Sequence, residues 1–174
     1  GKLDGNGFCI SGLNISDSQG YNLALFSQTE PTALIENLSL TGMVQGANWC
    51  SALVGINKGI IRNCMTDVKV SGKSAPSSAF VGTNYGTISF CYSIGEVVTG
   101  PNQKGHSGGF VNNNRGVIES SFALNKGIKY AMGYQSVLDT AIQKNEKEMT
   151  TSATYAKWNR DIWLIEDGKF PILK

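Results

Sequence analysis

Four segments of the chain share one pattern of apolar and polar positions: an apolar pair, a polar turn, an isoleucine and a second short apolar stretch. They begin at Ala24, Ala52, Ala79 and Gly109. With Ile10 added, the isoleucines form an anchor set at spacings of 25, 26, 27 and 30 residues: Ile10, Ile35, Ile61, Ile88 and Ile118. Self-similarity at a nearly fixed period is typical of repeat folds, so we expect a stacked architecture.

A single repeat of this kind is too short to be stable alone. Strands of about three to five residues bury too little apolar surface to offset the entropy lost when they are ordered. Stacked coil upon coil, with like residues about 4.8 Å apart, they share one core. The pattern therefore predicts an all-β solenoid of about five coils. Isoleucine, valine and cysteine ladders should lie inside it, and Cys64 and Cys91 occupy the same repeat position.

Three repeats carry an N-x-G triplet just before the anchoring isoleucine. These triplets are residues 57–59, 84–86 and 114–116. Asparagine and glycine tolerate positive φ, so we expect the chain to bend sharply at each triplet.

Composition divides the chain near residue 125. Residues 1–125 hold 18 of the 21 glycines and 14 of the 28 charged residues, and the last 49 residues hold the remainder. We expect solenoid repeats over 1–125. Residues 126–174 should form a last irregular coil and a C-terminal cap of the same domain, with a short helix within 140–151. Residues 1–7 offer no comparable cover at the other end, so we expect the chain to be part of a longer protein.

Charge and hydropathy remove two classes of partner. The formal charge is 15 − 13 = +2, without the clustered lysines and arginines that nucleic acids or anionic membranes require. The apolar runs fall far short of the ~20 residues of a spanning helix, so we expect no membrane insertion.

Several segments resemble the bacterial GLUG-motif family of extracellular repeat domains. They are KLDGNGFCISGLNIS, LVGINKGIIRNCMTDVKVSG, FVGTNYGTISFCYSIGEVVTG and WLIEDGKFPIL. The resemblance implies a right-handed parallel β-helix and a secreted or cell-surface location, with neighbouring domains of a parent chain. Family members occur in adhesins and in accessory regions of immunoglobulin A protease-like metallopeptidases. The fourth repeat departs from the motif at Asn112 and Ser121, and the family brings no catalytic residues to carry over.

Acidic residues on one face would be the signature of a polysaccharide hydrolase. The residues that follow the anchors should stack on one outer face, and they are Glu36, Arg62, Ser89 and Glu119. With about 4.8 Å per coil, the two glutamates would be roughly 14 Å apart, beyond the ~9.5 Å limit for an inverting pair. We expect a solvated charge ladder rather than an active site.

Histidine and cysteine give little support for a metal or a cofactor. His106, the single histidine, lies in a glycine-rich stretch that lengthens one coil, and we expect it to be exposed. The four cysteines are Cys9, Cys50, Cys64 and Cys91. An even number permits two disulfides in an exported protein, but Cys64 and Cys91 fit buried thiols better. With no C-x-x-C spacing, we expect no metal and no cofactor.

An apolar strip is the most informative surface feature. The fourth residue beyond each anchor should point outward, and these residues are Ser39, Met65, Tyr92 and Phe122. Either the C-terminal segment with Trp158 and Trp163 covers the strip, or Met65, Tyr92 and Phe122 form a platform for a glycan or a host-surface protein. Trp49 and Tyr85, in turns, are secondary binding candidates.

These observations predict a non-catalytic structural or binding module of a bacterial cell-surface or secreted protein, acting in adhesion or display. Two alternatives stay open. One is an accessory domain of an immunoglobulin A protease-like metallopeptidase, and the other is a carbohydrate-active β-helix enzyme.

Overall fold

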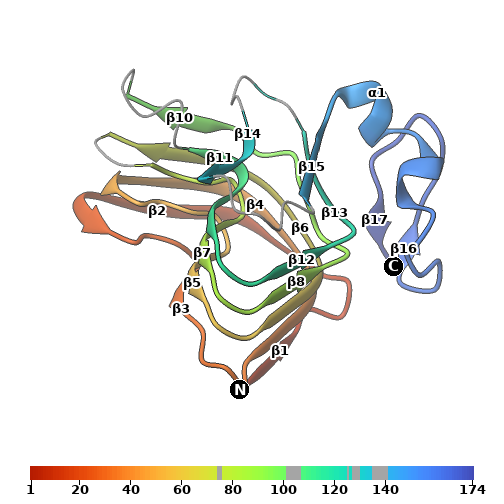
Figure 1. The fold of residues 1–174 in the computed structure, drawn as a ribbon, viewed down its shortest axis with the longest axis horizontal. Helices are drawn as coiled ribbons and strands as arrows, with labels where there is room; N and C mark the ends of the chain where they lie inside the picture. Colours follow the sequence, from red (N-terminus) through yellow and green to blue (C-terminus); the bar gives the residue numbers. More distant parts are fainter. Residues whose placement is uncertain (74–75, 101–106, 125, 127–129, 135–140) are drawn as a thin grey trace.

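The computed structural model describes residues 1–73, 76–100, 107–124, 126, 130–134 and 141–174. The chain folds as a parallel β-solenoid of about four turns, and a segment with a short helix follows near the C-terminus (Figure 1). The predicted all-β parallel solenoid is confirmed, with about four turns in place of the five expected, because Ile10 does not anchor a coil of its own. Among the described residues, no helix is long and apolar enough to cross a membrane.

Two parallel sheets form the walls of the solenoid in the described part of the chain. The larger, ten-stranded sheet contains β1 (Lys2–Asp4), β2 (Cys9–Tyr21), β4 (Leu34–Asn48), β6 (Ile60–Gly72), β8 (Thr87–Ser89), β9 (Tyr92–Ser93), β10 (Val97–Thr99), β12 (Val117–Glu119), β13 (Ser121–Leu124) and β15 (Ala141–Lys144). The five-stranded sheet contains β3 (Phe26–Gln28), β5 (Val54–Asn57), β7 (Val81–Asn84), β11 (Gly108–Asn114) and β14 (Tyr130–Tyr134).

The anchoring isoleucines superpose from turn to turn inside the solenoid. The parallel registers align four of the five predicted anchors, Ile35, Ile61, Ile88 and Ile118, and all four are buried. Ile10 does not belong to this ladder, because β2 pairs with the second half of β4 and places Ile10 opposite Leu40. The position below Ile35 belongs to Leu3 of β1.

A cysteine stack runs beside the isoleucines. Leu38 lies opposite Cys64. The backbone N–H of Cys64 donates to Cys91 Sγ over 3.4 Å, and the N–H of Cys91 donates to Ser121 Oγ over 3.1 Å. Cys64 and Cys91 thus occupy one stacked position, as their repeat alignment predicts.

The asparagines of the N-x-G triplets form a buried ladder of carboxamides. Asn57 Nδ2 donates to Asn84 Oδ1, and Asn84 Nδ2 donates to Asn114 Oδ1, each over 2.8 Å. Thr29 Oγ1 completes the ladder at its lower end by donating to Asn57 Oδ1 over 2.8 Å. All three asparagines are at most 1% exposed, so the ladder joins successive turns within the buried interior.

The chain passes from one sheet to the other at each of these triplets, as expected, but it does so without positive φ. None of their residues lies in the left-handed region. The glycines are needed because turns stack closely: a Cβ on Gly86 would overlap the backbone of Gly59, and a Cβ on Gly116 would overlap that of Gly86.

Residues with a left-handed backbone conformation lie at a different corner of the solenoid, between the anchoring isoleucine and the cysteine position of each turn. Four residues there have φ of 53°, 50°, 54° and 43°: Asn37, Asn63, Phe90 and Ser120. Asparagine adopts this conformation at low cost, whereas phenylalanine and serine do so less readily. The first two turns therefore use a residue suited to the bend, and the next two do not.

The C-terminal segment runs as a strap along the side of the solenoid (Figure 1). The strap (residues 145–174) contains α1 (Glu146–Met149), a 3₁₀ helix (Ser152–Tyr155), β16 (Trp163–Leu164) and β17 (Ile172–Leu173). It begins beside the last turn, next to β13 and β15, and its end reaches the first, where a Cβ on Gly7 would overlap the carbonyl of Lys174 (Figure 1).

The helix is shorter than the sequence suggests. Residues 141–144 are strand β15, which pairs with β13 and so extends the sheet. Residue 140 lies outside the described residues. Asn145 caps α1: its Oδ1 accepts from the backbone N–H of Glu148, and the Glu148 carboxylate accepts from the N–H of Asn145, which fixes where the helix begins.

Candidate functional site

The predicted apolar strip exists, and the strap covers it. Met65 lies opposite Tyr92, and Tyr92 opposite Phe122. Tyr92 is 0% exposed and Phe122 is 7% exposed, both within a cluster that includes Trp158 and Trp163. The alternative prediction, that Tyr92 and Phe122 form an exposed platform for a ligand, is therefore wrong. Met65, half-buried against the same cluster, is part of this interface as well.

The strap interface is densely aromatic and largely buried. The ring of Phe122 stacks on that of Trp158 with centroids 6.1 Å apart, and Tyr92 packs at 5.8 Å from Trp163. The Tyr92 hydroxyl donates to the carbonyl of Pro171, and Trp158 Nε1 donates to the carbonyl of Ser120 over 2.9 Å. Burial raises the pKa of Tyr92 well above its ordinary value. These contacts hold the strap in place rather than expose a site.

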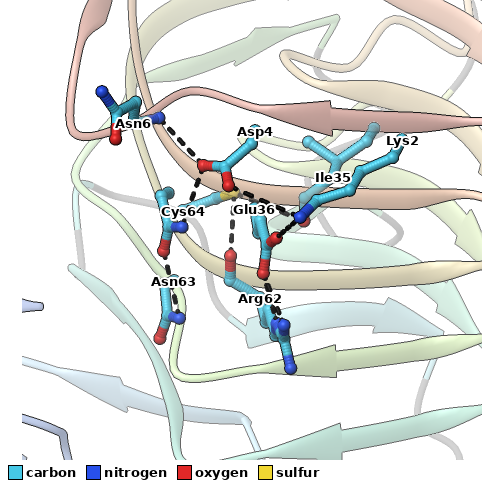
Figure 2. Close-up of polar contacts among 9 residues, drawn as sticks. Lys2, Asp4, Asn6, Ile35, Glu36, Arg62, Asn63 and Cys64 are labelled. Carbon is cyan, nitrogen blue, oxygen red and sulfur yellow. Dashed lines mark hydrogen bonds and ion pairs between the residues drawn. The ribbon is translucent and has the colours of Figure 1, made fainter.

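The outer charge ladder is an ion-pair network at the N-terminal turns. Glu36, Arg62, Ser89 and Glu119 follow one another in register. Lys2 Nζ lies 2.7 Å from Glu36 Oε1, and Arg62 Nη2 lies 2.6 Å from Oε2 (Figure 2). The hydrogen bond from Lys2 and then that from Arg62 lower the pKa of Glu36, so this carboxylate stays ionised near neutral pH and is poorly suited to act as a general acid.

A second polar column runs beside the charges. Asn37 Nδ2 donates to Asp4 Oδ1 over 3.0 Å, and Asn63 Nδ2 donates to Asn37 Oδ1 over 3.3 Å. The bond from Asn37, followed by that from the backbone N–H of Asn6, lowers the pKa of Asp4. The column fills the left-handed corner of the first turns and acts as a structural device.

The histidine and cysteine predictions have different outcomes. His106 lies outside the described residues. All four cysteines are free thiols, with Cys9 exposed and the other three buried. Burial raises the pKa of the Cys50 thiol to about 11 and that of Cys91 well above its ordinary value. Among the described residues, no three histidine, cysteine or acidic side chains lie close enough together to hold a metal ion.

The secondary candidates, Trp49 and Tyr85, are both exposed. Trp49 is 46% exposed and Tyr85 is 50% exposed. Trp49 borders a hollow of about 470 Å³ whose other lining residues are Thr83, Asn112, Asn113 and Arg115. Tyr85 does not line the hollow, but the guanidinium of Arg115 lies over its ring, 5.8 Å from the centroid.

Sequence reasoning did not select the polar residues of this hollow. One signal was present: Asn112 stands where the other repeats have a glycine, which the register places at Gly55 and Gly82. The juxtaposition of Trp49 with Arg115 could not be found from the repeat pattern, because Trp49 lies in a connection between β4 and β5 whose path the period does not determine.

Comparison with known proteins finds distant, partial relatives. The chain is 33% identical over 75 residues to halomucin of Haloquadratum walsbyi, a match that covers 42% of this chain and 1% of halomucin. It is 38% identical over 72 residues to a putative Gly-rich membrane protein of Evansella cellulosilytica, covering 39% of this chain and 8% of that protein. The chain thus spans a small part of the length of these relatives. No family model and no solved structure match it.

Proposed function

We propose that this chain is a non-catalytic structural module of a cell-surface or secreted protein. The observation that carries the proposal is the strap, which packs along the side of the solenoid and contacts both its last and its first turn. Ladders of isoleucine, cysteine and asparagine already join adjacent turns. A strap across all of them suits a rigid spacer or display unit.

The relatives support a surface location. One is named halomucin and the other a putative Gly-rich membrane protein, and each is many times longer than the matched segment. A compact module repeated or embedded in a very long chain suits spacing and display at a cell boundary. We place the module next to further domains of its parent chain and expect its partners to be a glycan or a protein of another cell surface.

The finer assignment rests on the sequence resemblance to the bacterial GLUG-motif domains. It supports adhesion as the role of the parent protein. It equally supports an accessory domain beside an immunoglobulin A protease-like metallopeptidase. An H-E-x-x-H motif elsewhere in the parent chain would favour the protease context.

Immunolabelling tests the location directly. Antibodies raised against the purified chain should label intact cells of the organism that encodes it, or its culture medium. An antibody against a cytoplasmic protein, which should label only permeabilised cells, is the control. Labelling of this chain only after permeabilisation would refute a surface role.

An activity assay tests the non-catalytic part of the proposal. Purified protein incubated with polysaccharides should release no new reducing ends, and their release would favour the carbohydrate-active alternative.

A further inference from the structure

The hollow beside Trp49 combines an exposed indole with polar side chains on the outside of the solenoid. Thr83 and Asn113 share one register position on the adjacent strands β7 and β11 and are half-buried. Trp49 and Arg115 complete the lining. An aromatic face beside amide, hydroxyl and guanidinium groups matches the chemistry of a sugar ring, which has apolar C–H faces and polar edges.

Trp49 is held in a backbone conformation that its side chain does not favour. Its φ is 50°. Tyr21 pairs with Asn48, so the next residues, Asn22 and Trp49, follow each other in the stack, and Asn22 has a φ of 53°. The lower turn thus uses asparagine for this bend, whereas the upper turn carries a large, exposed indole. Backbone strain of this kind is found preferentially at binding sites.

Asn112 brings an unsatisfied group to the same place. The residue is 5% exposed, and its Oδ1 has no hydrogen-bond partner among the described residues. A buried carboxamide oxygen without a donor destabilises the fold. Asn112 is one of the residues that line the hollow, so a ligand hydroxyl bound there would supply the missing donor.

Arg115 supplies a positive charge that the described part of the protein does not neutralise. The side chain is exposed, lies over the ring of Tyr85, and forms no ion pair with a described carboxylate. A guanidinium fork binds a carboxylate in two parallel hydrogen bonds. A carboxylate on the ligand would therefore find its partner at this edge of the hollow.

We infer that the hollow binds a carboxylate-bearing sugar residue. Its ring would lie on Trp49, its carboxylate on Arg115, and one hydroxyl would donate to Asn112 Oδ1. Thr83 and Asn113 would contact the remaining hydroxyls. The inference goes beyond the structural role proposed above and does not depend on it, because binding is measured on the purified protein and location on cells.

Calorimetric titration of the full chain with trisaccharides of galacturonic and glucuronic acid tests the inference. The fully methyl-esterified forms of the same trisaccharides are the neutral controls. We expect saturable binding of at least one acid and about tenfold weaker binding of its ester, since a lost charged contact costs on the order of 1.4 kcal/mol. Equal affinity for acid and ester, or no saturable binding of either acid at millimolar concentration, would overturn the inference.

Matched variants localise the site. Arg115→Ala should weaken binding about tenfold and abolish the preference for the acid, whereas Lys58→Ala, at the same position of an earlier N-x-G triplet, should change the affinity less than about twofold. Trp49→Asn introduces the residue type that stands at the equivalent bend of the turn below, and Asn112→Gly introduces the glycine of the other repeats. Both variants should therefore fold, and both should bind the acidic trisaccharide about tenfold less tightly. Unchanged affinity in Trp49→Asn, or an equal loss in Lys58→Ala, would contradict the assignment.

Discussion

Buried carboxamides are the residues on which the stacking of turns depends most specifically. Isoleucines can slide past each other, since the hydrophobic effect has no direction. The amide ladder is directional: Asn57 and Asn84 each accept from the turn below and donate to the turn above. It therefore fixes the register between turns as well as contributing to stability.

Asn84, the middle member of the ladder, should be the most sensitive position. Asn84→Ala leaves the Nδ2 of Asn57 and the Oδ1 of Asn114 without their inter-turn partners inside the core. We expect the free energy of unfolding to fall by about 2–3 kcal/mol, because two buried inter-turn hydrogen bonds are lost, each worth about 1–1.5 kcal/mol. Urea unfolding measures it. Asn14→Ala, at an exposed position, is the control and should change stability by less than about 0.5 kcal/mol; equal effects of the two would contradict the ladder's role.

Ser120 offers the opposite case, a residue poorly matched to its backbone. Its φ is 43°, at the corner where Asn37 and Asn63 stand in earlier turns. Ser120→Asn should raise the free energy of unfolding by about 0.5–1 kcal/mol, because asparagine adopts this conformation with less strain. The backbone carbonyl that Trp158 contacts is retained. A loss of stability in thermal or urea unfolding would show that the serine side chain has a role that the bend does not explain.

At the scale of elements, the repeat predicted the central strands well. The alignment placed Met65, Tyr92 and Phe122 in one column, because β6, β9 and β13 keep the same number of residues between anchor and strip. It failed at Ile10, where β2 follows a different path before the period is established. Periodicity fixes register only where a strand has equivalent neighbours.

Other features could not be read from the period at all. Alternation indicated that Tyr92 and Phe122 leave the core, but both a covered and an open strip fit that pattern. Covering them requires contacts with residues 155–165, far away in sequence. The repeat pattern identified the triplets at 57–59, 84–86 and 114–116, but it did not indicate why they are needed. Their glycines let stacked backbones approach closely, and their asparagine amides point inward. Both features depend on the neighbouring turn, which a local turn rule does not include.

The ion-pair network joins β1, β4 and β6, and it makes stability depend on pH. Glu36 is 4% exposed and contacts Lys2 and Arg62. Its pKa is lower in the folded protein than the ordinary value of 4.5. The stability from its charge is therefore complete above about pH 4.5 and is lost as the pH falls through the folded value.

Glu36→Gln should lower the free energy of unfolding at pH 7 by about 1–2 kcal/mol, a modest cost because both cations are half-exposed to solvent. The difference from the wild type should shrink toward pH 3. Urea unfolding at both values measures it. Glu119→Gln, an exposed member of the same column, is the control and should have little effect at either pH. A difference for Glu36→Gln that does not change with pH would contradict the charge-based account.

At the scale of the whole molecule, the strap makes the fold more than a sum of turns. In a simple solenoid each coil contacts only its neighbours, so terminal turns can separate first. Here the aromatic cluster joins the strap to Tyr92 and Phe122 in the later turns, and the C-terminus lies against Gly7 in the first. We expect this connection to make unfolding cooperative along the length of the solenoid.

Equilibrium unfolding followed by two signals tests this claim most directly. In the Trp49→Asn variant, the remaining tryptophans are Trp158 and Trp163, both buried in the strap interface. Their fluorescence reports the strap, and far-ultraviolet circular dichroism reports the sheets. A strap that secures the solenoid predicts one transition with coincident midpoints in urea. A fluorescence transition completed at lower urea, while the β-sheet signal stays unchanged, would show that the strap detaches by itself and would contradict the account.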